Sequence, residues 1–200
     1  MLPDPLKKFI DLFSSLPGIG PRQSVRLGYY LVNQGKAAID ELAKGVAGLG
    51  TLSNCTHCFR IAKAGARGLC PVCADPQRIQ NLVAIVEKDT DVMSLEQAKK
   101  YRGTYLVLGD LAKDGFLSPQ QKLRLNFLKS RVKQFPDGKL EEMIVALNPT
   151  SYGDIQAALI IEELKPFAKK ITRLGRGLPT GGEIEFADEE TLGGAIDNRI

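Results

Sequence analysis

The sequence predicts an α/β protein in three parts: a small helical N-terminal part, a four-cysteine motif and a parallel-sheet domain. Three observations lead there: two CxxC pairs, a change in apolar period after residue 80, and strands alternating with helices up to residue 174. Strands that alternate with helices favour a parallel sheet covered on both faces. With 200 residues, 44% of them apolar, the chain has enough material for one large or two small domains.

Three helices are expected in the first 50 residues. We expect the first to be capped by Asp4 and to begin at Pro5, because proline suits the first helical position. A second helix follows the turn at residues 16–21, and a third runs from about residue 36 to 49. Their apolar residues recur at helical spacing.

The chain beyond the cysteines reads as alternating strands and helices. A serine followed by proline marks the start of its longest helix. The expected strands lie at 81–86, 104–108, 142–147 and 170–174, and the expected helices at 92–100, 118–134 and 154–164.

The four cysteines form two CxxC pairs, with eleven residues between the pairs. They are Cys55, Cys58, Cys70 and Cys73. A CxxC turn places two thiolates on one metal, and two such turns complete the tetrahedral shell that zinc prefers. We therefore predict one structural Zn²⁺ per chain, whose removal destabilises the N-terminal half; redox or buried cysteines are the alternative. His57, the only histidine, is expected in an exposed turn, since four cysteines already fill the shell.

A glycine-rich turn joins the first two helices. Gly18, Ile19 and Gly20 lie in an L-P-G-I-G pattern, and Arg22 and Arg26 follow one helical turn apart. The glycines leave backbone N–H groups free at a helix start, where a phosphate can bind. The pattern resembles the helix-hairpin-helix DNA-binding motif, which makes these five residues the predicted DNA-binding site. An ordinary turn between helices is the alternative.

Acidic residues follow the first strand of the sheet domain, at the edge where sites form in open α/β sheets. Glu87 follows the strand directly, and Asp89 and Asp91 come next. This resembles the toprim fold of topoisomerases and DnaG-type primases, in which a glutamate and a D-x-D pair hold magnesium. Glu87 matches the glutamate, but a single acid, Asp110, follows the second strand. We therefore expect no magnesium-dependent catalysis; a Mg²⁺-dependent nuclease or primase-like enzyme is the alternative.

Charge and apolar runs constrain location and partners. Residues 1–80 hold ten Lys or Arg against five Asp or Glu, whereas residues 81–200 hold 17 against 18. The excess of basic residues in residues 1–80 suggests that this part of the chain binds an anionic partner. No apolar run approaches the ~18 residues of a membrane helix, and the N-terminus has no signal-peptide core. We expect a cytoplasmic protein without a membrane partner, and in that reducing compartment cysteine pairs favour metal over disulfides.

The order of these parts, with a few local sequences, is specific. The local sequences are Cys58-Phe59, Tyr101-Arg102-Gly103, Asn148-Pro149-Thr150 and the tail from Gly177 to Asp188. Together they resemble the RecR family of bacterial recombination mediators over nearly the whole chain. The resemblance implies a helix-hairpin-helix region at 1–53, a zinc-finger motif at 54–76, a toprim domain at 80–174, and a Walker B-like tail with oligomer contacts at 175–200. No G-x-x-x-x-G-K-[ST] loop accompanies the tail, so we expect no ATPase site.

The resemblance also implies the function and the partners. It implies a non-enzymatic mediator of recombinational DNA repair, which acts with RecO, and in some pathways RecF, to load RecA on single-stranded or gapped DNA. A ring-like tetramer able to encircle DNA, associated with the nucleoid during repair, is implied as well. Glu87, Asp91 and Asp154 would form the acidic surface where RecO docks. Tyr152 replaces an acid of the family's V-E-G-E pattern, a departure that bears on the strength or the identity of that contact.

Overall fold

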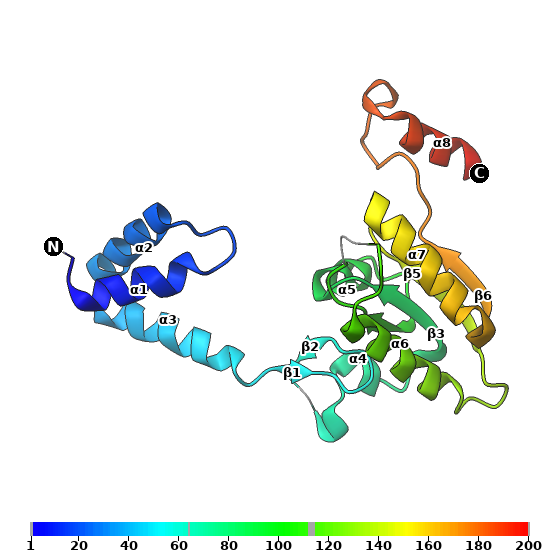
Figure 1. The fold of residues 1–200 in the computed structure, drawn as a ribbon, viewed down its shortest axis with the longest axis horizontal. Coiled ribbons are helices and arrows are strands. Elements are labelled where there is room, and N and C mark those ends of the chain that lie inside the picture. Colours follow the sequence, from blue (N-terminus) through cyan, green and yellow to red (C-terminus); the bar gives the residue numbers. More distant parts are fainter. Residues whose placement is uncertain (1, 64, 112–114, 200) are drawn as a thin grey trace. The chain divides into compact units, whose positions relative to one another are not determined.

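The computed structural model describes residues 2–63, 65–111 and 115–199. The chain divides into two compact units, Met1–Leu52 and Ser53–Ile200, and each is described by itself (Figure 1). The first is helical and the second contains the sheet.

The N-terminal unit consists of α1 (Asp4–Ser14), α2 (Pro21–Gln34) and α3 (Lys36–Leu49), as the sequence predicts. Gly28 lets α1 and α2 approach closely: a Cβ atom there would lie 2.5 Å from Leu6 Cδ1. Across the same contact, the hydroxyls of Ser14 and the buried Ser24 lie 3.1 Å apart. The hairpin is therefore held by packing between its own two helices.

The expected cap of α1 is wrong. Pro3 is the N-cap residue, Asp4 is the first helical residue, and no side chain caps the helix. Asp4 instead forms an ion pair of 2.9 Å with Lys7 on the next turn. A carboxylate is favoured anywhere in the first turn by the helix dipole, so its presence does not by itself mark the cap.

The larger unit is built on a four-stranded parallel sheet in the order β4-β3-β5-β6. Its strands are β3 (Ile79–Val86), β4 (Gly103–Val107), β5 (Leu140–Ala146) and β6 (Ala168–Arg173). All four lie where the sequence predicts them, although β3, β5 and β6 each begin two residues earlier. A parallel sheet must have both faces covered, and here two different layers cover them.

Successive residues of β3 point to opposite faces of the sheet. Val83 and Ile85 point to a core shared with α6 (Pro119–Val132) and α7 (Ser151–Leu164), which cover one face of the sheet (Figure 1). Ala84 and Val86 point to a second core, formed with α5 (Asp89–Gln97) and the four cysteines. The cysteine motif is thus part of the covering layer of the sheet.

Short elements carry the cysteines. They are β1 (Ser53–Asn54), β2 (Ile61–Ala62), the 3-10 turn η1 (Ala66–Gly68) and α4 (Pro71–Ala74). The motif is tied to the sheet by the backbone, since the N–H of Val107 in β4 donates to the carbonyl of Cys58 at 2.8 Å. The motif therefore belongs to the same compact unit as the sheet.

Two helices begin earlier than their apolar spacing indicates. α5 starts at Asp89, so Asp89 and Asp91 lie in its first turn, and the Asp91 carboxylate accepts from the N–H of Lys88. α7 starts at Ser151 behind the N-cap Thr150, whose hydroxyl accepts from the N–H of Gly153. Polar capping residues begin these helices before the first apolar position, which apolar spacing alone does not detect.

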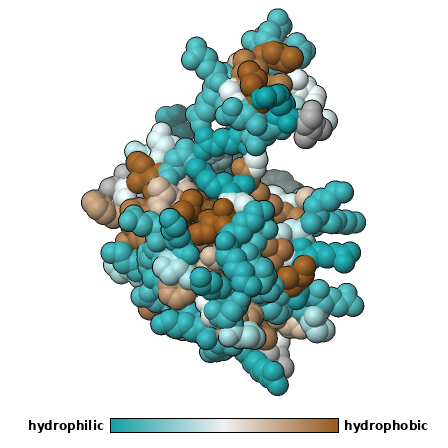
Figure 2. Space-filling view, turned by 90° about the vertical axis from the view of Figure 1, so that its right-hand side faces the viewer, coloured by the Kyte–Doolittle hydropathy of each residue, from teal (hydrophilic) through white to brown (hydrophobic). Residues whose placement is uncertain are grey.

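The C-terminal segment holds two elements that the sequence analysis did not expect. After a 3-10 turn, η2 (Lys165–Phe167), and strand β6, they are η3 (Ile184–Phe186) and α8 (Glu189–Asp197). Asp188 caps α8 by accepting from the N–H of Thr191 at 2.8 Å. The segment forms the upper part of Figure 2, where apolar side chains are exposed among charged ones; Phe186 is 79% exposed. Within the described residues, no helix is long and apolar enough to cross a membrane.

Candidate metal centre and nucleic-acid interface

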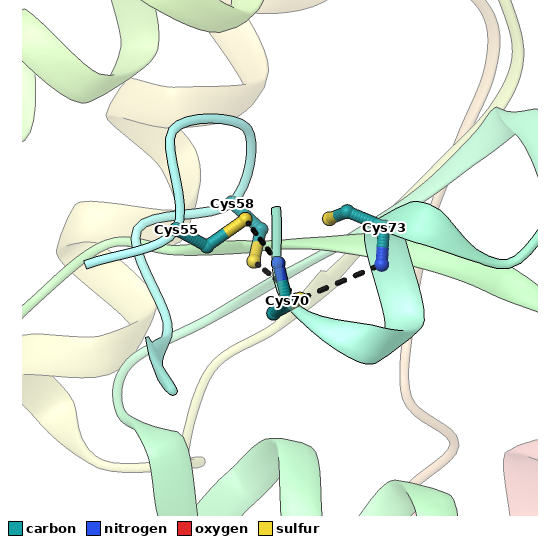
Figure 3. Close-up of side chains that lie close together, drawn as sticks. All are labelled: Cys55, Cys58, Cys70 and Cys73. Carbon is teal, nitrogen blue, oxygen red and sulfur yellow. Dashed lines mark hydrogen bonds between the residues drawn. The ribbon is translucent and has the colours of Figure 1, made fainter. Parts of the chain in front are cut away.

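The four predicted ligands come together in one buried cluster (Figure 3). Cys55 and Cys58 lie on the loop between β1 and β2, and Cys70 and Cys73 lie at the N-cap and within α4. Their sulfur atoms all lie within 4.8 Å of one another, and the sulfurs of Cys58 and Cys70 are 3.6 Å apart. The loop after β1 and the start of α4 thus present four thiols to one point.

This arrangement fits the donor set of a tetrahedral zinc site. Sulfurs on one zinc ion lie about 3.8 Å apart, since each Zn–S bond is about 2.3 Å long. Backbone N–H groups point at the sulfurs: those of His57 and Cys70 donate to Cys55, at 3.4 and 3.2 Å, and that of Cys73 donates to Cys70. Such donors favour thiolates over thiols. His57 lies in a turn, as expected, but is half-buried rather than exposed.

The thiols influence one another's protonation. The hydrogen bond from Cys58, followed by that from Cys73, lowers the pKa of Cys70 far below the usual range. The same contact with Cys70 raises the pKa of Cys58. Cys70 is therefore the thiol of the cluster that most readily becomes a thiolate, the form that binds a metal.

The predicted DNA-binding residues lie together on the helical unit. Gly18 has a φ of +77°, a conformation that glycine adopts without strain, and Gly20 is the N-cap of α2. No side chain caps the first turn of α2, so its backbone N–H groups remain available at that end. Arg22 and Arg26 are exposed on the same helix, and among the described residues no carboxylate forms an ion pair with either. Ile19 is half-buried in the turn.

The acidic residues at the edge of the sheet are engaged within the chain. Glu87, whose side chain is only 12% exposed, accepts from the amide of Asn148 at 2.9 Å and lies 3.4 Å from the ammonium of Lys88. Asp89 accepts from the N–H of Ile61. In the described part of the chain, the cysteines are the only group of three or more Cys, His, Asp or Glu whose ligand atoms come together. The carboxylates after β3 and β4 thus form no cluster there.

Asp154 binds the start of the C-terminal segment. Arg173 and Arg176 both donate to its Oδ1 at 2.5 Å, and Arg176 also pairs with Glu190 of α8. These two guanidiniums lower the pKa of Asp154. The residues adjoin a cleft of about 540 Å³ at the carboxyl edge of β5 and β6, which Asp91, Arg176 and Glu190 also line. The predicted partner residues Asp91 and Asp154 therefore lie near one cleft.

Asp154→Asn should loosen the segment around Arg176. The neutral amide removes the charge shared by the two arginines, so we expect faster hydrogen exchange and faster proteolysis at residues 174–183. Because the folded pKa is lowered, the contribution of Asp154 is present above the pKa of an unfolded aspartate and is lost as the pH falls below about 4. Glu163→Gln removes a carboxylate that pairs with Lys129 on α6 and serves as the control. Equal protection in both variants would argue against this role of Asp154.

Two arginines of α6, one buried and one half-buried, were not found from the sequence. Arg124 and Arg131 lie seven residues apart, on the stripe that also carries the buried Leu125, Leu128 and Val132. The guanidinium of Arg124 donates to the carbonyl of Val107 at 2.9 Å, and that of Arg131 to the carbonyl of His57 at 3.3 Å. Both arginines lie at helical spacing from these apolar residues, and this spacing is the sequence signal that could have identified the two arginines.

Comparisons with known proteins match the sheet region and the C-terminal segment to family models, and match nearly the whole chain to individual relatives. A family model described as the Toprim domain matches residues 81–175, and one described as RecR, C-terminal, matches residues 177–200. Recombination protein RecR of Chloroflexus aggregans is 36% identical over 201 residues, which cover 98% of this chain and 93% of that protein. Recombination protein RecR of Lactococcus lactis subsp. lactis is 35% identical, over 99% and 98% of the two chains. Recombination protein RecR of Dehalococcoides mccartyi is 36% identical, over 97% and 93%.

Proposed function

The chain belongs to the RecR family, and we propose that it is a non-enzymatic, DNA-binding mediator of recombinational DNA repair. In this role it acts with RecO, and in some pathways RecF, to load RecA onto single-stranded or gapped DNA. The relatives' shared name supports the role in recombination. The loading step and the partners are inferred from the family.

One observation carries the DNA-binding part of the proposal: two exposed arginines follow an uncapped helix start. Backbone N–H groups and the helix dipole favour a phosphate at the start of α2, and Arg22 and Arg26 lie within the next turn and a half. Contacts of this kind position a nucleic acid without reading its bases. The site therefore suits DNA of any sequence.

Replacing both arginines by alanine should weaken DNA binding and make it less dependent on salt. Each lost phosphate contact on duplex DNA reduces the slope of log K against log salt by about 0.9, so Arg22→Ala with Arg26→Ala should flatten it by nearly 2 per chain. Fluorescence anisotropy with labelled oligonucleotides at several salt concentrations measures both quantities. The single variants should fall between the double variant and the parent.

Lys44→Ala is the matched control, because Lys44 is an exposed cation on α3 of the same unit. A general loss of positive charge would weaken binding equally in this variant. If the double arginine variant binds as the parent does, with an unchanged salt slope, α2 is not the DNA surface.

We assign the cysteine cluster one structural zinc ion. Cys55, Cys58, Cys70 and Cys73 would fill its tetrahedral shell, which leaves no open position for a substrate. Zinc would supply a cross-link between the loop before β2 and α4, and elemental analysis should give one zinc per chain. Magnesium at Glu87 is not part of the proposal, because the contacts with Asn148 and Lys88 already engage that carboxylate.

The absence of catalysis has its own test. Magnesium-dependent cleavage or synthesis of DNA by the purified protein, abolished by Glu87→Gln, would contradict a purely mediating role. The toprim-type nuclease or primase-like function would then replace it.

The acidic cleft is the proposed docking place for RecO. Asp91 lines the cleft and supplies negative charge there, although Glu87 is largely covered. The carboxylate of Asp154 adjoins the cleft and is paired with Arg173 and Arg176. Tyr152 and Ile155, 46% and 49% exposed on the same helix as Asp154, give the surface an apolar part. The exposed apolar residues of the C-terminal segment support contacts between copies of the chain in a tetrameric ring.

A further inference from the structure

Arg131, near the end of α6, is half-buried and carries a charge that the function proposed above does not use. Its Nη1 donates to the carbonyl of His57, between the first two cysteines. Its Nη2 is buried and has no hydrogen-bond partner among the described residues. An enclosed N–H without an acceptor is costly and needs an explanation.

Arg131 contacts the cysteine motif rather than a carboxylate, through its hydrogen bond to the carbonyl of His57. In the described part of the chain, no carboxylate lies within ion-pair distance of Arg131. Arg60, the nearest guanidinium in sequence to the first pair of cysteines, faces Asp89 at 4.0 Å, so its charge is already opposed.

The charge of a four-thiolate zinc centre explains this placement. Four thiolates and one Zn²⁺ sum to −2, and burying that charge is unfavourable unless a cation lies nearby. Groups outside the ligand shell that donate to the ligands or balance their charge raise metal affinity. A buried guanidinium with a free N–H is suited to both tasks.

We propose that Arg131 is the counter-charge of the four-cysteine metal centre, and that it couples zinc affinity to the packing of α6. The inference rests on the zinc site proposed above. It makes Arg131 a positioning residue, since the ligands themselves are the four cysteines. Zinc occupancy then stabilises α6, which packs in the core on the other face of the sheet from the cysteine cluster.

Arg124 provides a control within the same helix. It is buried, its Nη1 also donates to a backbone carbonyl, and its guanidinium lies 5.2 Å from the ring centroid of Phe59. The charge that acts on it is the carboxylate of Asp89, not the thiolates. The two arginines therefore share a helix and a hydrogen bond to a backbone carbonyl but differ in their electrostatic partner.

Zinc affinity of the full chain tests the proposal, by competition with a chromophoric chelator in Arg131→Met, Arg131→Lys and Arg124→Met. Thermal unfolding of each variant measures its loss of stability. We expect Arg131→Met to weaken zinc binding by about 10–100-fold, the range typical of groups outside the ligand shell. Arg131→Lys should recover much of that loss, and Arg124→Met should match the parent. Co²⁺ substitution should still give the spectrum of a four-sulfur tetrahedral site in Arg131→Met.

The outcomes separate the two proposals. A parent protein that binds no zinc would overturn the zinc site itself. Zinc binding in the parent with equal affinity in Arg131→Met and Arg124→Met would overturn only the role of Arg131. If Arg131→Met does not fold, hydrogen exchange of the parent decides: chelation should increase exchange at residues 128–133 more than at 119–124, and equal exchange in both stretches would overturn the proposal.

Discussion

Cys70→Ser should unfold the layer that covers one face of the sheet and lower the free energy of unfolding of the larger unit by several kcal/mol. Structural zinc contributes about 10–16 kcal/mol of apparent binding free energy in small zinc peptides, so a loss on the order of 5 kcal/mol is expected here. Cys70 is fully buried and accepts from Cys73 within a cluster that also contains Val86 and Tyr105. From the sequence, this effect is expected in the N-terminal half; the structure assigns it to the unit Ser53–Ile200.

Thermal unfolding, zinc content and hydrogen exchange together measure this effect. Exchange should rise in β3 and β4, while the helices of residues 2–52 keep the parent's protection. Val72→Ala is the matched control, because Val72 lies between the last two cysteines and packs in the same cluster without binding metal. It should cost only about 0.5–3 kcal/mol and retain zinc. Equal losses in the two variants would mean that packing, and not metal, stabilises the layer.

Gly153→Ala should also destabilise the larger unit strongly, although alanine normally stabilises a helix by about 1 kcal/mol relative to glycine. Gly153 lies in the first turn of α7, and a Cβ atom there would lie 2.0 Å from the backbone oxygen of Asn148. That oxygen also accepts from the N–H of Thr150 at 2.8 Å, so it cannot move without breaking the turn. We expect a loss of about 3 kcal/mol, at the upper end of overpacking costs.

Gly193→Ala is the control, since Gly193 lies within α8 and a Cβ atom there meets nothing within 4 Å. Urea unfolding should show a normal or slightly raised midpoint for Gly193→Ala and a much lower one for Gly153→Ala. Asn148 donates to Glu87, so the turn also determines how this carboxylate is presented at the edge of the sheet. A stability of Gly153→Ala equal to the parent's would show that the turn at Asn148 can relax.

Much of the architecture could be predicted from local patterns. The four parallel strands, the three N-terminal helices and the cysteine pairs depend on residue spacing over a few positions, and the structure confirms all of them. Helix starts were predicted less accurately, because the caps formed by Asp91, Thr150 and Asp188 depend on polar side chains outside the apolar pattern. The last of these caps begins α8, which was missed in a segment where glycines obscure the helical period.

The sequence by itself determined the chemistry that the chain carries. Two CxxC pairs supply four thiols for one metal, and Arg22 and Arg26 follow a glycine turn, because the residues of each set lie close together along the chain. Only the tertiary structure decided what surrounds that chemistry. It packs the cysteine cluster against the sheet, brings Arg131 to that cluster, and neutralises Asp154 with Arg173 and Arg176. These contacts join residues far apart in sequence. The burial and the charge environment of each site therefore depend on tertiary packing, which short sequence patterns do not predict.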